Sequence, residues 1–322
     1  MSQHAYTVRP LLDSWIGFGA PTIEVVAYSA LPRHTRFPAG ACIFADIERL
    51  TPPQTELAEA LWDRLSSAGD SVRLLNHPRR TLRRFDLLER LYAEGINRFR
   101  AFRVANGWQD WKYPVFLREA NEHSGSLSIL IRNDLSLRRR IIELLLEGHR
   151  PEDLLVVEFC DTADAGGVYR KYSAFRVGDR ILPRHVLFSR DWVQKDLDLL
   201  DEHLRDEVRE YCRLNPHENE LHEIFALANI EYGRIDYSLL DGSIQVWEIN
   251  TNPVVIKARH KYSRRSRLFH ERFLRAFGVA LHALSGVPGS GVAVNWDDVD
   301  PTDFVSARGD MMPEAAELDS AR

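Results

Sequence analysis

The sequence predicts a mixed α/β fold made of α+β lobes, on two main observations. Short apolar runs of strand length alternate with longer segments in which apolar side chains recur every three or four residues, the spacing of amphipathic helices. Near the C-terminal end, two alternating runs flank Asp241-Gly242, and an Asp-Gly pair between such runs is a strong signal of a β-hairpin. Helices and strands are therefore expected along the whole chain, with at least one antiparallel strand pair.

Length and composition are those of a globular protein with two or three lobes. The chain has 322 residues, of which 44% are hydrophobic and 28% are charged. No run of about 18 apolar residues could span a membrane, and the first residues lack the layout of a signal peptide. We therefore expect a cytoplasmic protein with no membrane partner. A formal net charge of -5 gives no electrostatic basis for nucleic acid as a main partner.

A small Rossmann-like lobe is predicted over residues 1–80. A strand at 41–47, a helix that begins at Thr51 with prolines in its first turn, and a strand at 72–75 form a β-α-β unit. The stretch before Ser29 is predicted to be irregular, because glycine and proline interrupt any period.

The rest of the chain is predicted to form a second lobe at 81–157 and a third at 158–285. In the second lobe, Thr81 begins a helix that ends at Gly95, and a polar loop separates two short strands. The remaining elements are strands at 115–118, 128–132, 154–160, 172–177 and 180–187, and helices at 136–148, 196–213, 217–229 and 263–284. Residues 286–322, rich in Gly, Pro, Ser and acidic side chains, are predicted to be a loosely ordered tail.

The hairpin at 232–253 carries Asp236, Glu248 and Asn250, the most informative side chains of the sequence. Residues two apart on a strand share a face, so Glu248 and Asn250 point the same way. A strict two-residue turn would place Asp236 and Glu248 on opposite faces of the sheet. A three-residue loop, Leu240-Asp241-Gly242, or a bulge would bring both carboxylates to one face, and we predict one of these two.

Two carboxylates and an amide oxygen on one face are the ligands that magnesium prefers, usually together with substrate phosphates. The alternative is that Asp236, Glu248 and Asn250 are ordinary solvated side chains of a strand face. The spacing of three residues does not by itself decide between these interpretations.

The segment from Tyr232 to Pro253, YGRIDYSLLDGSIQVWEINTNP, resembles the C-terminal signature of the ATP-grasp superfamily. The resemblance is to the branch that includes D-alanine:D-alanine ligase, glutathione synthetase and glutamate ligases. It implies that two Mg²⁺ ions, with Mn²⁺ as an alternative, are held on ATP by Asp236, Glu248 and Asn250. It also implies that Arg234 stabilises charge near an acyl phosphate. The usual glycine after Pro253 is replaced here by valine.

Weaker matches lie upstream, in the order that the superfamily requires. The strand 114–118 resembles the one whose basic residue, normally lysine, grips the nucleotide phosphates, which assigns that role to Arg118. Arg103, or alternatively Lys112, would be a second cation. The loop that follows would cover the phosphates through Ser124, Gly125 and Ser126, although superfamily loops hold several glycines.

The strand 155–160 resembles the one between the lobes that binds adenine. The resemblance places Glu158 beside the adenine and assigns backbone contacts to Phe159 and Cys160, with Asp161 or Asp164 on the ribose. Basic residues of the next strand pair resemble those directed at the transferred phosphate. These are Arg170, Lys171 and Arg184, of which Lys171 is the preferred candidate.

A basic run at 259–267 follows the hairpin, for which three interpretations remain open. It is a solvated helix face, a nucleic-acid patch, or, through Lys257 and Arg259, a binding site for the carboxylate of an acidic substrate.

The resemblance implies an ATP-dependent carboxylate-amine ligase that works through an acyl phosphate. Its partners would be ATP, a small carboxylate and an amine, amino-acid or peptide-like in character; homodimers are common among similar ligases. Two alternatives use the same site: an ATP-grasp phosphotransferase, and a nucleotide-binding protein that has lost turnover. The sequence does not identify the substrates.

Overall fold

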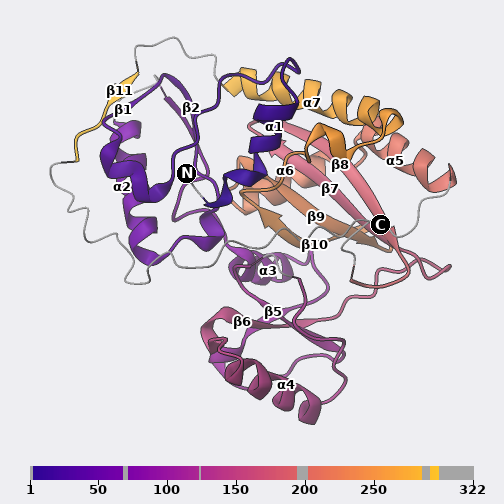
Figure 1. Cartoon of the computed structure of the whole chain (residues 1–322). Coiled ribbons are helices and arrows are strands. Elements are labelled where there is room, and N and C mark those ends of the chain that lie inside the picture. The colour runs from indigo at the N-terminus through magenta and orange to yellow at the C-terminus, as the bar shows by residue number, and fades with distance from the viewer. Residues whose placement is uncertain (1–2, 68–71, 123–124, 194–201, 285–290, 297–322) are drawn as a thin grey trace.

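The computed structural model describes residues 3–67, 72–122, 125–193, 202–284 and 291–296, and it confirms the mixed α/β fold (Figure 1). Its α-helices are α1 (Arg9–Ser14), α2 (Pro52–Ser66), α3 (Arg84–Ala93), α4 (Asp134–Leu146), α5 (Glu202–Leu214), α6 (Glu218–Leu227) and α7 (Arg264–Leu284). Its strands are β1 (Arg36–Phe37), β2 (Gly40–Ile43), β3 (Val72–Leu75), β4 (Ala101–Arg103), β5 (Val115–Glu119), β6 (Leu154–Glu158), β7 (Tyr169–Val177), β8 (Arg180–Ser189), β9 (Tyr232–Leu240), β10 (Ser243–Asn250) and β11 (Val292–Ala293). Short 3-10 helices lie at Gln3–Thr7, Tyr28–Arg33, Ile47–Arg49, Val104–Asn106, Pro151–Asp153 and Arg259–Lys261.

The predicted β-α-β unit is present near the N-terminus. Strands β2 and β3 pair in parallel, and α2 connects them. Thr51 caps α2 as expected, because its side chain and that of Gln54 form a reciprocal capping box. The strand predicted at 41–47 is shorter than expected: β2 ends at Ile43, and Asp46 farther on has a left-handed φ of 61°.

Two terminal segments differ from the prediction. Helix α1 occupies part of the stretch expected to be irregular, and Trp15 beside it is buried. In the expected tail, β11 pairs with β1, and Val294 and Trp296 are buried in the core of the first lobe. Residues 291–296 therefore belong to the folded protein, whereas 297–322 lie outside the described residues.

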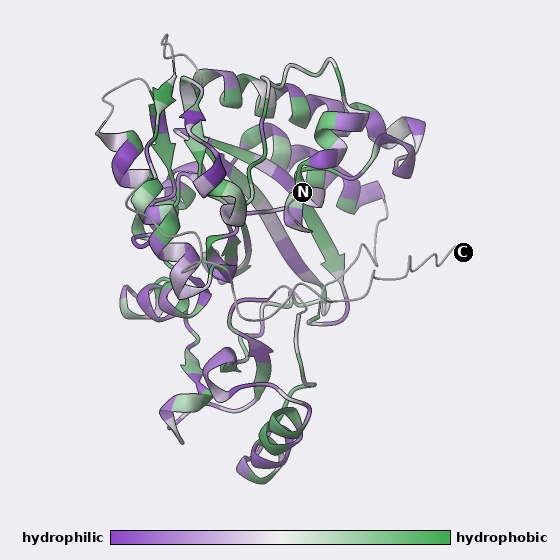
Figure 2. Ribbon diagram, turned by 60° about the vertical axis from the view of Figure 1, so that its left-hand side comes forward, coloured by the Kyte–Doolittle hydropathy of each residue, from purple (hydrophilic) through white to green (hydrophobic). Residues whose placement is uncertain are grey.

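The middle of the chain forms a three-stranded antiparallel sheet in the order β4-β6-β5, with α4 beside it. Figure 2 shows α4 at the bottom of the molecule with hydrophilic and hydrophobic residues alternating along it. The predicted strand at 128–132 is wrong. Residues 126–131 run antiparallel to β5 but pair with it only at two isolated bridges, Arg118 with Ser126 and Val115 with Ile131. The second helix begins at Arg84 rather than Thr81, whose hydroxyl instead donates to the carbonyl of Asn229.

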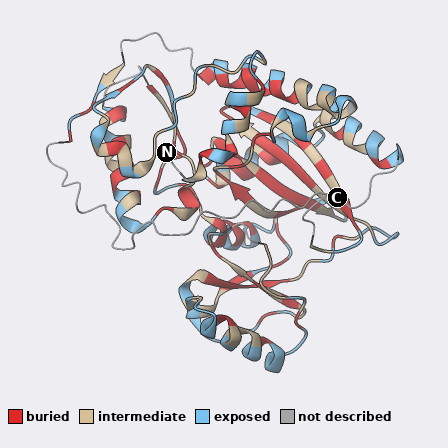
Figure 3. Cartoon of the chain, in the orientation of Figure 1, coloured by how far each residue is buried: buried red, intermediate tan, exposed pale blue. Residues whose placement is uncertain are grey.

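The C-terminal part is built on a four-stranded antiparallel sheet in the order β10-β9-β7-β8. One face of this sheet is mainly apolar and packs against α3, α5 and α6. Arg170 and Arg176 of β7 lie at the margins of this face. Figure 3 shows the strands of this sheet largely buried. Leu87 and Leu91 of α3 belong to this core, so α3 joins the β4-β6-β5 sheet to the C-terminal sheet. The lobe boundaries at 80, 157 and 285 remain a prediction.

The other face of the sheet is covered over only part of its length. Phe175, Val177 and Tyr232 pack against α7 and α1. Beyond them, the same face carries polar and charged side chains. They are Lys171, Ser173, His185, Arg234, Asp236, Ser238, Glu248 and Asn250. Since a polar strand face needs water or a ligand, this part of the sheet is the candidate floor of a functional site.

Candidate metal and nucleotide site

A bulge in the hairpin brings the two carboxylates together. The turn itself has two residues, Asp241 and Gly242, both with positive φ, so the predicted three-residue loop is wrong. The register then shifts at Trp247, and Glu248 lies directly opposite Asp236. The prediction of a bulge is confirmed, and the two carboxylates share one face.

Asp236 is buried, with 6% of its surface exposed, and is held by two neighbours. Ser173 of β7 donates its hydroxyl to Oδ1 at 2.5 Å, and Arg234 donates its Nε to the same oxygen at 3.1 Å. Arg234 also comes within 3.5 Å of Oδ2. The predicted catalytic arginine is therefore next to the predicted metal ligand, on the same strand and face.

Glu248 is bonded by two arginines, of which only Arg118 was expected from the sequence. Arg118 of β5 donates to Oε2 at 3.0 Å, and Arg84 of α3 donates to the same oxygen at 2.6 Å. Burial and the nearby Arg84 cation lower the pKa of Arg118 to about 10, although Glu248 opposes this effect. Arg118, expected from the sequence to bind phosphates, thus contacts Glu248, expected to bind the metal.

Arg84 also holds the chain that follows β5. Its Nη1 donates to the carbonyl oxygens of Glu119, Ala120 and Glu122, at 3.0, 3.0 and 2.7 Å. Only 5% of Arg84 is exposed. One feature of the sequence could have pointed to Arg84: it lies in the first turn of a helix, beside Phe85. A cation is unfavourable there because of the helix dipole, so an arginine at this position suggests another role.

Asn250 ends β10 and leads into contacts with the first lobe. It is buried, and its Oδ1 accepts a bond from the backbone of Asn252 at 2.8 Å. The next residue, Thr251, donates its hydroxyl to Glu48 and accepts from the backbone N–H of Ile47 at 3.0 Å. The end of the hairpin is therefore fixed against the first lobe.

The donor set fits a magnesium ion that also binds phosphate. Asp236 and Glu248 face each other, Asn250 is two residues from Glu248 on the same face, and all three are oxygen donors. Three guanidinium groups, of Arg84, Arg118 and Arg234, pair with the two carboxylates. A cation bound here would share Glu248 with both guanidinium groups.

The predicted phosphate loop is only partly described. Gly125 has a φ of 91°, which favours glycine, and Ser126 donates its hydroxyl to the carbonyl of Ser128 at 2.5 Å. Ser124 lies outside the described residues. Arg103, the proposed second cation, donates to the carbonyl of Glu152 at 3.1 Å and stacks over Phe85 at 4.3 Å.

On the proposed adenine side, Glu158 ends β6 and is 3% exposed. Its two carboxylate oxygens accept backbone N–H groups of Arg100 and Lys112, at 3.0 and 2.7 Å. Phe159 donates its backbone N–H to the carbonyl of Pro114, and burial raises the pKa of Cys160 to about 11. Glu158 therefore ties two segments of the small sheet together.

The two ribose candidates lie in the turn after β6. Asp161 accepts the backbone N–H of Ala163 at 3.2 Å. Asp164 accepts two backbone N–H groups and pairs with Arg170 at 2.5 Å, and this guanidinium lowers the pKa of Asp164 to about 2. Arg170 also pairs with Glu207, so it stabilises this turn against α5.

Lys171 lies on the polar face of the C-terminal sheet, the same face as Ser173. Arg184 lies on β8 and turns toward α7, where its Nη1 is 3.1 Å from Nδ1 of His270. In the later basic run, Arg259 pairs with Glu271 and stacks over Trp15 and Phe18.

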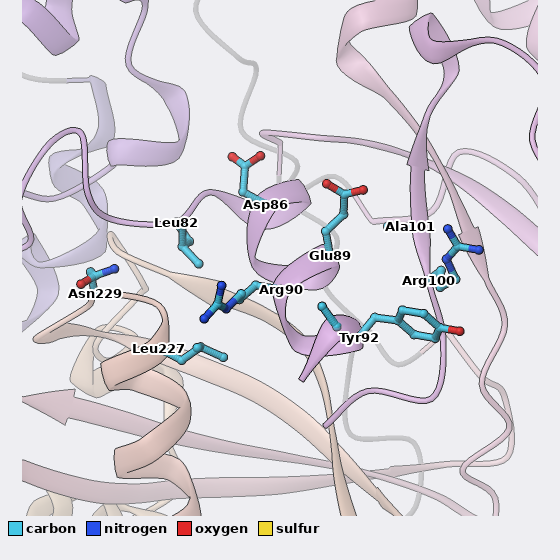
Figure 4. Close-up of a pocket in the computed structure, with 10 residues that line it drawn as sticks. Leu82, Asp86, Glu89, Arg90, Tyr92, Arg100, Ala101, Leu227 and Asn229 are labelled. Carbon is cyan, nitrogen blue, oxygen red and sulfur yellow. The ribbon is translucent and has the colours of Figure 1, made fainter. Parts of the chain in front are cut away.

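A cavity of about 730 Å³ lies elsewhere, against α3, β4 and α6 (Figure 4). Charged side chains such as Asp86, Glu89 and Arg90 line it, and Figure 4 shows the two carboxylates turned away from Arg90. None of its lining residues belongs to the predicted site. The donor chemistry, rather than the size of this cavity, identifies the candidate site.

No protein-family model matches the sequence, and no curated protein matches it. Among solved structures, D-alanine–D-alanine ligase from Bacillus anthracis is similar at a TM-score of 0.48 and 13% identity, over 88% of this chain and 95% of that chain. Carboxyaminoimidazole ribonucleotide synthase from Aspergillus clavatus, complexed with ATP, has a TM-score of 0.40 and 16% identity, over 66% and 53%. L-amino acid ligase from Bacillus licheniformis has a TM-score of 0.37 and 12% identity, over 74% and 61%. In the part of the chain that the structure describes, no helix is long and apolar enough to cross a membrane.

Proposed function

We propose that this chain is an ATP-grasp enzyme, an ATP-dependent ligase that joins a carboxylate to an amine. The observation that carries the proposal is the direct opposition of Asp236 and Glu248 on a polar sheet face, with Asn250 beside them. The resemblance of residues 232–253 to the ATP-grasp signature supports it. The side chains that the signature assigns to the metal thus lie together in the structure.

Asp236, Glu248 and Asn250 would hold magnesium, which when bound neutralises phosphate oxygens. Arg118 would bind the phosphates from the small sheet, since a guanidinium can bond phosphate through two parallel N–H groups. Lys171, on the same sheet face, would contact the transferred phosphoryl group. These assignments place cations on both sides of the phosphates.

The proposed reaction has two steps. A substrate carboxylate oxygen attacks the γ-phosphorus of ATP, the bond to the β,γ-bridging oxygen breaks, and ADP leaves. The amine nitrogen then attacks the acyl carbon, inorganic phosphate leaves, and the nitrogen loses a proton. Arg234 would stabilise the negative charge that develops on the acyl oxygen, because it lies beside Asp236 on the same face.

The test is ADP release by the full chain with Mg²⁺, ATP and panels of carboxylates and amines. We expect amide formation to accompany ADP release, and Glu248→Gln to reduce the rate by roughly 100-fold or more, because a charged ligand is lost. Asp179→Asn is the control, since it alters an exposed carboxylate at the β7–β8 turn.

Three results would contradict the ligase. A stable phosphorylated product without an amide would identify a phosphotransferase. Tight ATP binding without ADP release would identify a binding protein. A lack of any ATP-dependent thermal stabilisation would exclude the nucleotide site itself.

A further inference from the structure

Basic side chains gather on the polar sheet face toward β8, and one of them, Arg234, comes from the metal hairpin itself. They come from four elements: Lys171 on β7, Arg184 and His185 on β8, Arg234 on β9 and His270 on α7. A second bulge causes the gathering. Ser173 pairs with His185 and Ala174 with Pro183, so Arg184 is the extra residue of β8. A bulge turns a side chain out of the regular pattern, and here Arg184 contacts α7.

Arg184 is a buried cation without a carboxylate partner among the described residues. It is 6% exposed, its Nη1 is 3.1 Å from Nδ1 of His270, and its guanidinium lies 4.5 Å from the Phe273 ring centre. Tyr262 also bonds it and packs on His270, with ring centres 4.0 Å apart. These partners are neutral or aromatic. Burying a charge without a counter-charge is costly, so the fold maintains an unbalanced positive charge here.

The two histidines support this interpretation of the local charge. Burial, followed by Arg184, lowers the pKa of His270 to about 3. Burial also holds the pKa of His185 well below its usual value, and Arg184, Arg234, Lys171 and His270 act in the same direction. Neutral His270 can therefore accept a hydrogen bond from Arg184.

The basic end is separate from the metal ligands but on the same floor. Across the sheet, Glu248 lies opposite Asp236, Asp236 opposite Ser173, and Ser173 opposite His185. Neighbouring strands are about 4.8 Å apart, so two intervals place His185 about 10 Å from Asp236. A group bound at Arg184 would therefore be several bonds away from a carboxylate that reacts beside Asp236.

We propose that Arg184, with His185 and His270, binds a second anionic group of the substrate, a carboxylate or a phosphate monoester that takes no part in the phosphoryl transfer. This inference rests on the proposed function, because that function places the reacting carboxylate at Asp236. It defines the substrate class as small molecules with two acidic groups. Lys171 and Arg234 add positive potential but serve the reacting end.

The test is calorimetric binding of three probes to the full chain, with Mg²⁺ and a nonhydrolysable ATP analogue present to occupy the nucleotide site. Glutarate carries two carboxylates, 3-phosphonopropionate carries a carboxylate and a phosphonate, and butyrate carries one carboxylate. We expect one of the two dianions to bind at least tenfold more tightly than butyrate. The dianion that binds more tightly shows whether the second group of the substrate is a carboxylate or a phosphate.

Arg184→Gln should reduce that preference for the dianion at least tenfold, and Arg184→Lys should restore part of it. Arg180→Gln, on the same strand but exposed, is the matched control. If Arg184→Gln does not fold, His270→Leu tests the same site and should weaken the dianion several-fold. Equal binding of dianion and butyrate, or a preference unchanged in both variants, would overturn the inference.

Binding of the probes without nucleotide separates this inference from the proposed function. If ATP fails to stabilise the protein but the dianion still binds through Arg184, the ligase fails and the anion site stands. If ATP binds and ADP is released while Arg184→Gln changes neither probe binding nor substrate KM, the anion site fails alone.

Discussion

The two ends of the polar face of the β10-β9-β7-β8 sheet differ in how their charged side chains are paired. At the β9–β10 end, Asp236 and Glu248 are bonded by Arg234, Arg84 and Arg118, so each acid already has a guanidinium partner. At the β8 end, Arg184 is buried against a neutral histidine and an aromatic ring. The first end is called the balanced end below, because each carboxylate has a cation partner within the chain. The second is left for a ligand to balance.

Both ends depend on a bulge, at Trp247 in one case and at Arg184 in the other. Bulges are concentrated next to functional sites because they re-aim side chains. Trp247 donates its indole N–H to Ser238 at 2.9 Å, which holds the first bulge in place. Pro183 precedes the second bulge, on an edge strand where a missing N–H is tolerated. Backbone irregularity, rather than regular pairing, thus sets up both groups of side chains.

Replacing Arg84 tests the balanced end and has the largest expected effect on stability. Arg84→Leu removes the bonds to Glu248 and to three carbonyls of the chain after β5. Removing one partner of a buried ion pair costs about 3 kcal/mol or more. We expect that loss in the free energy of unfolding, measured by urea denaturation.

Arg90→Leu is the matched control on the same helix. Arg90 is an exposed arginine that pairs with Glu94 at 2.9 Å, and such surface pairs contribute about 0 to 1 kcal/mol. Equal losses in the two variants would show that the balanced end has no special role in stability.

More of the balanced end, with Asp236 and Glu248, could be predicted from the sequence than of the basic end around Arg184. Asp236, Glu248 and Asn250 lie in one local hairpin, where alternation and the Asp-Gly turn limit the arrangements. The choice between a loop and a bulge was not local, because Trp247 is fixed by Ser238 on the neighbouring strand. Arg84 was missed because its contact with Glu248 joins residues 164 positions apart.

The basic end depends on contacts between distant segments. Arg184 was singled out from the sequence, but as a phosphate ligand. His185 and His270 had no local pattern, since His270 becomes relevant only when α7 packs on this sheet. The register shift beside Pro183 decides where Arg184 points. The alternation of side chains along the strand does not reveal this shift.

Replacing Ser173 tests the boundary between the two ends, with an intermediate expected effect. Its hydroxyl donates to Asp236 at 2.5 Å, and it is completely buried. Hydrogen bonds to charged groups contribute about 1.5 to 3 kcal/mol, so Ser173→Ala should destabilise the protein by about 2 kcal/mol. Ser243→Ala, at the exposed start of β10, is the control and should change stability by less than about 0.5 kcal/mol. A loss for Ser173→Ala no larger than that of the control would mean that Asp236 is held by Arg234 alone.

The smallest expected effect is a pH dependence that belongs to the basic end. The pKa of His270 is about 3 in the folded protein, against about 6.5 in an unfolded chain. Between these values the unfolded chain binds a proton that the folded chain does not, so stability falls as the pH drops below about 6.5. His270→Gln keeps an acceptor for Arg184 but does not titrate. We expect the stability lost between pH 7.5 and 5.5 to be smaller in this variant by about 1 kcal/mol, with allowance for the partial exposure of the ring.

The measurement is urea denaturation of wild type and His270→Gln at both pH values, with His203→Gln, an exposed histidine on α5, as the control. Burial also lowers the pKa of His185 and of His217, so both proteins should keep part of the dependence. Only the difference between them reports on His270, whose pKa is lowered first by burial and then by Arg184. If this difference is absent, His270 takes up its proton normally in the folded state, so it does not lie beside an unpaired cation. In that case the positive charge at this end is already balanced, and the contrast between the two ends of the sheet disappears.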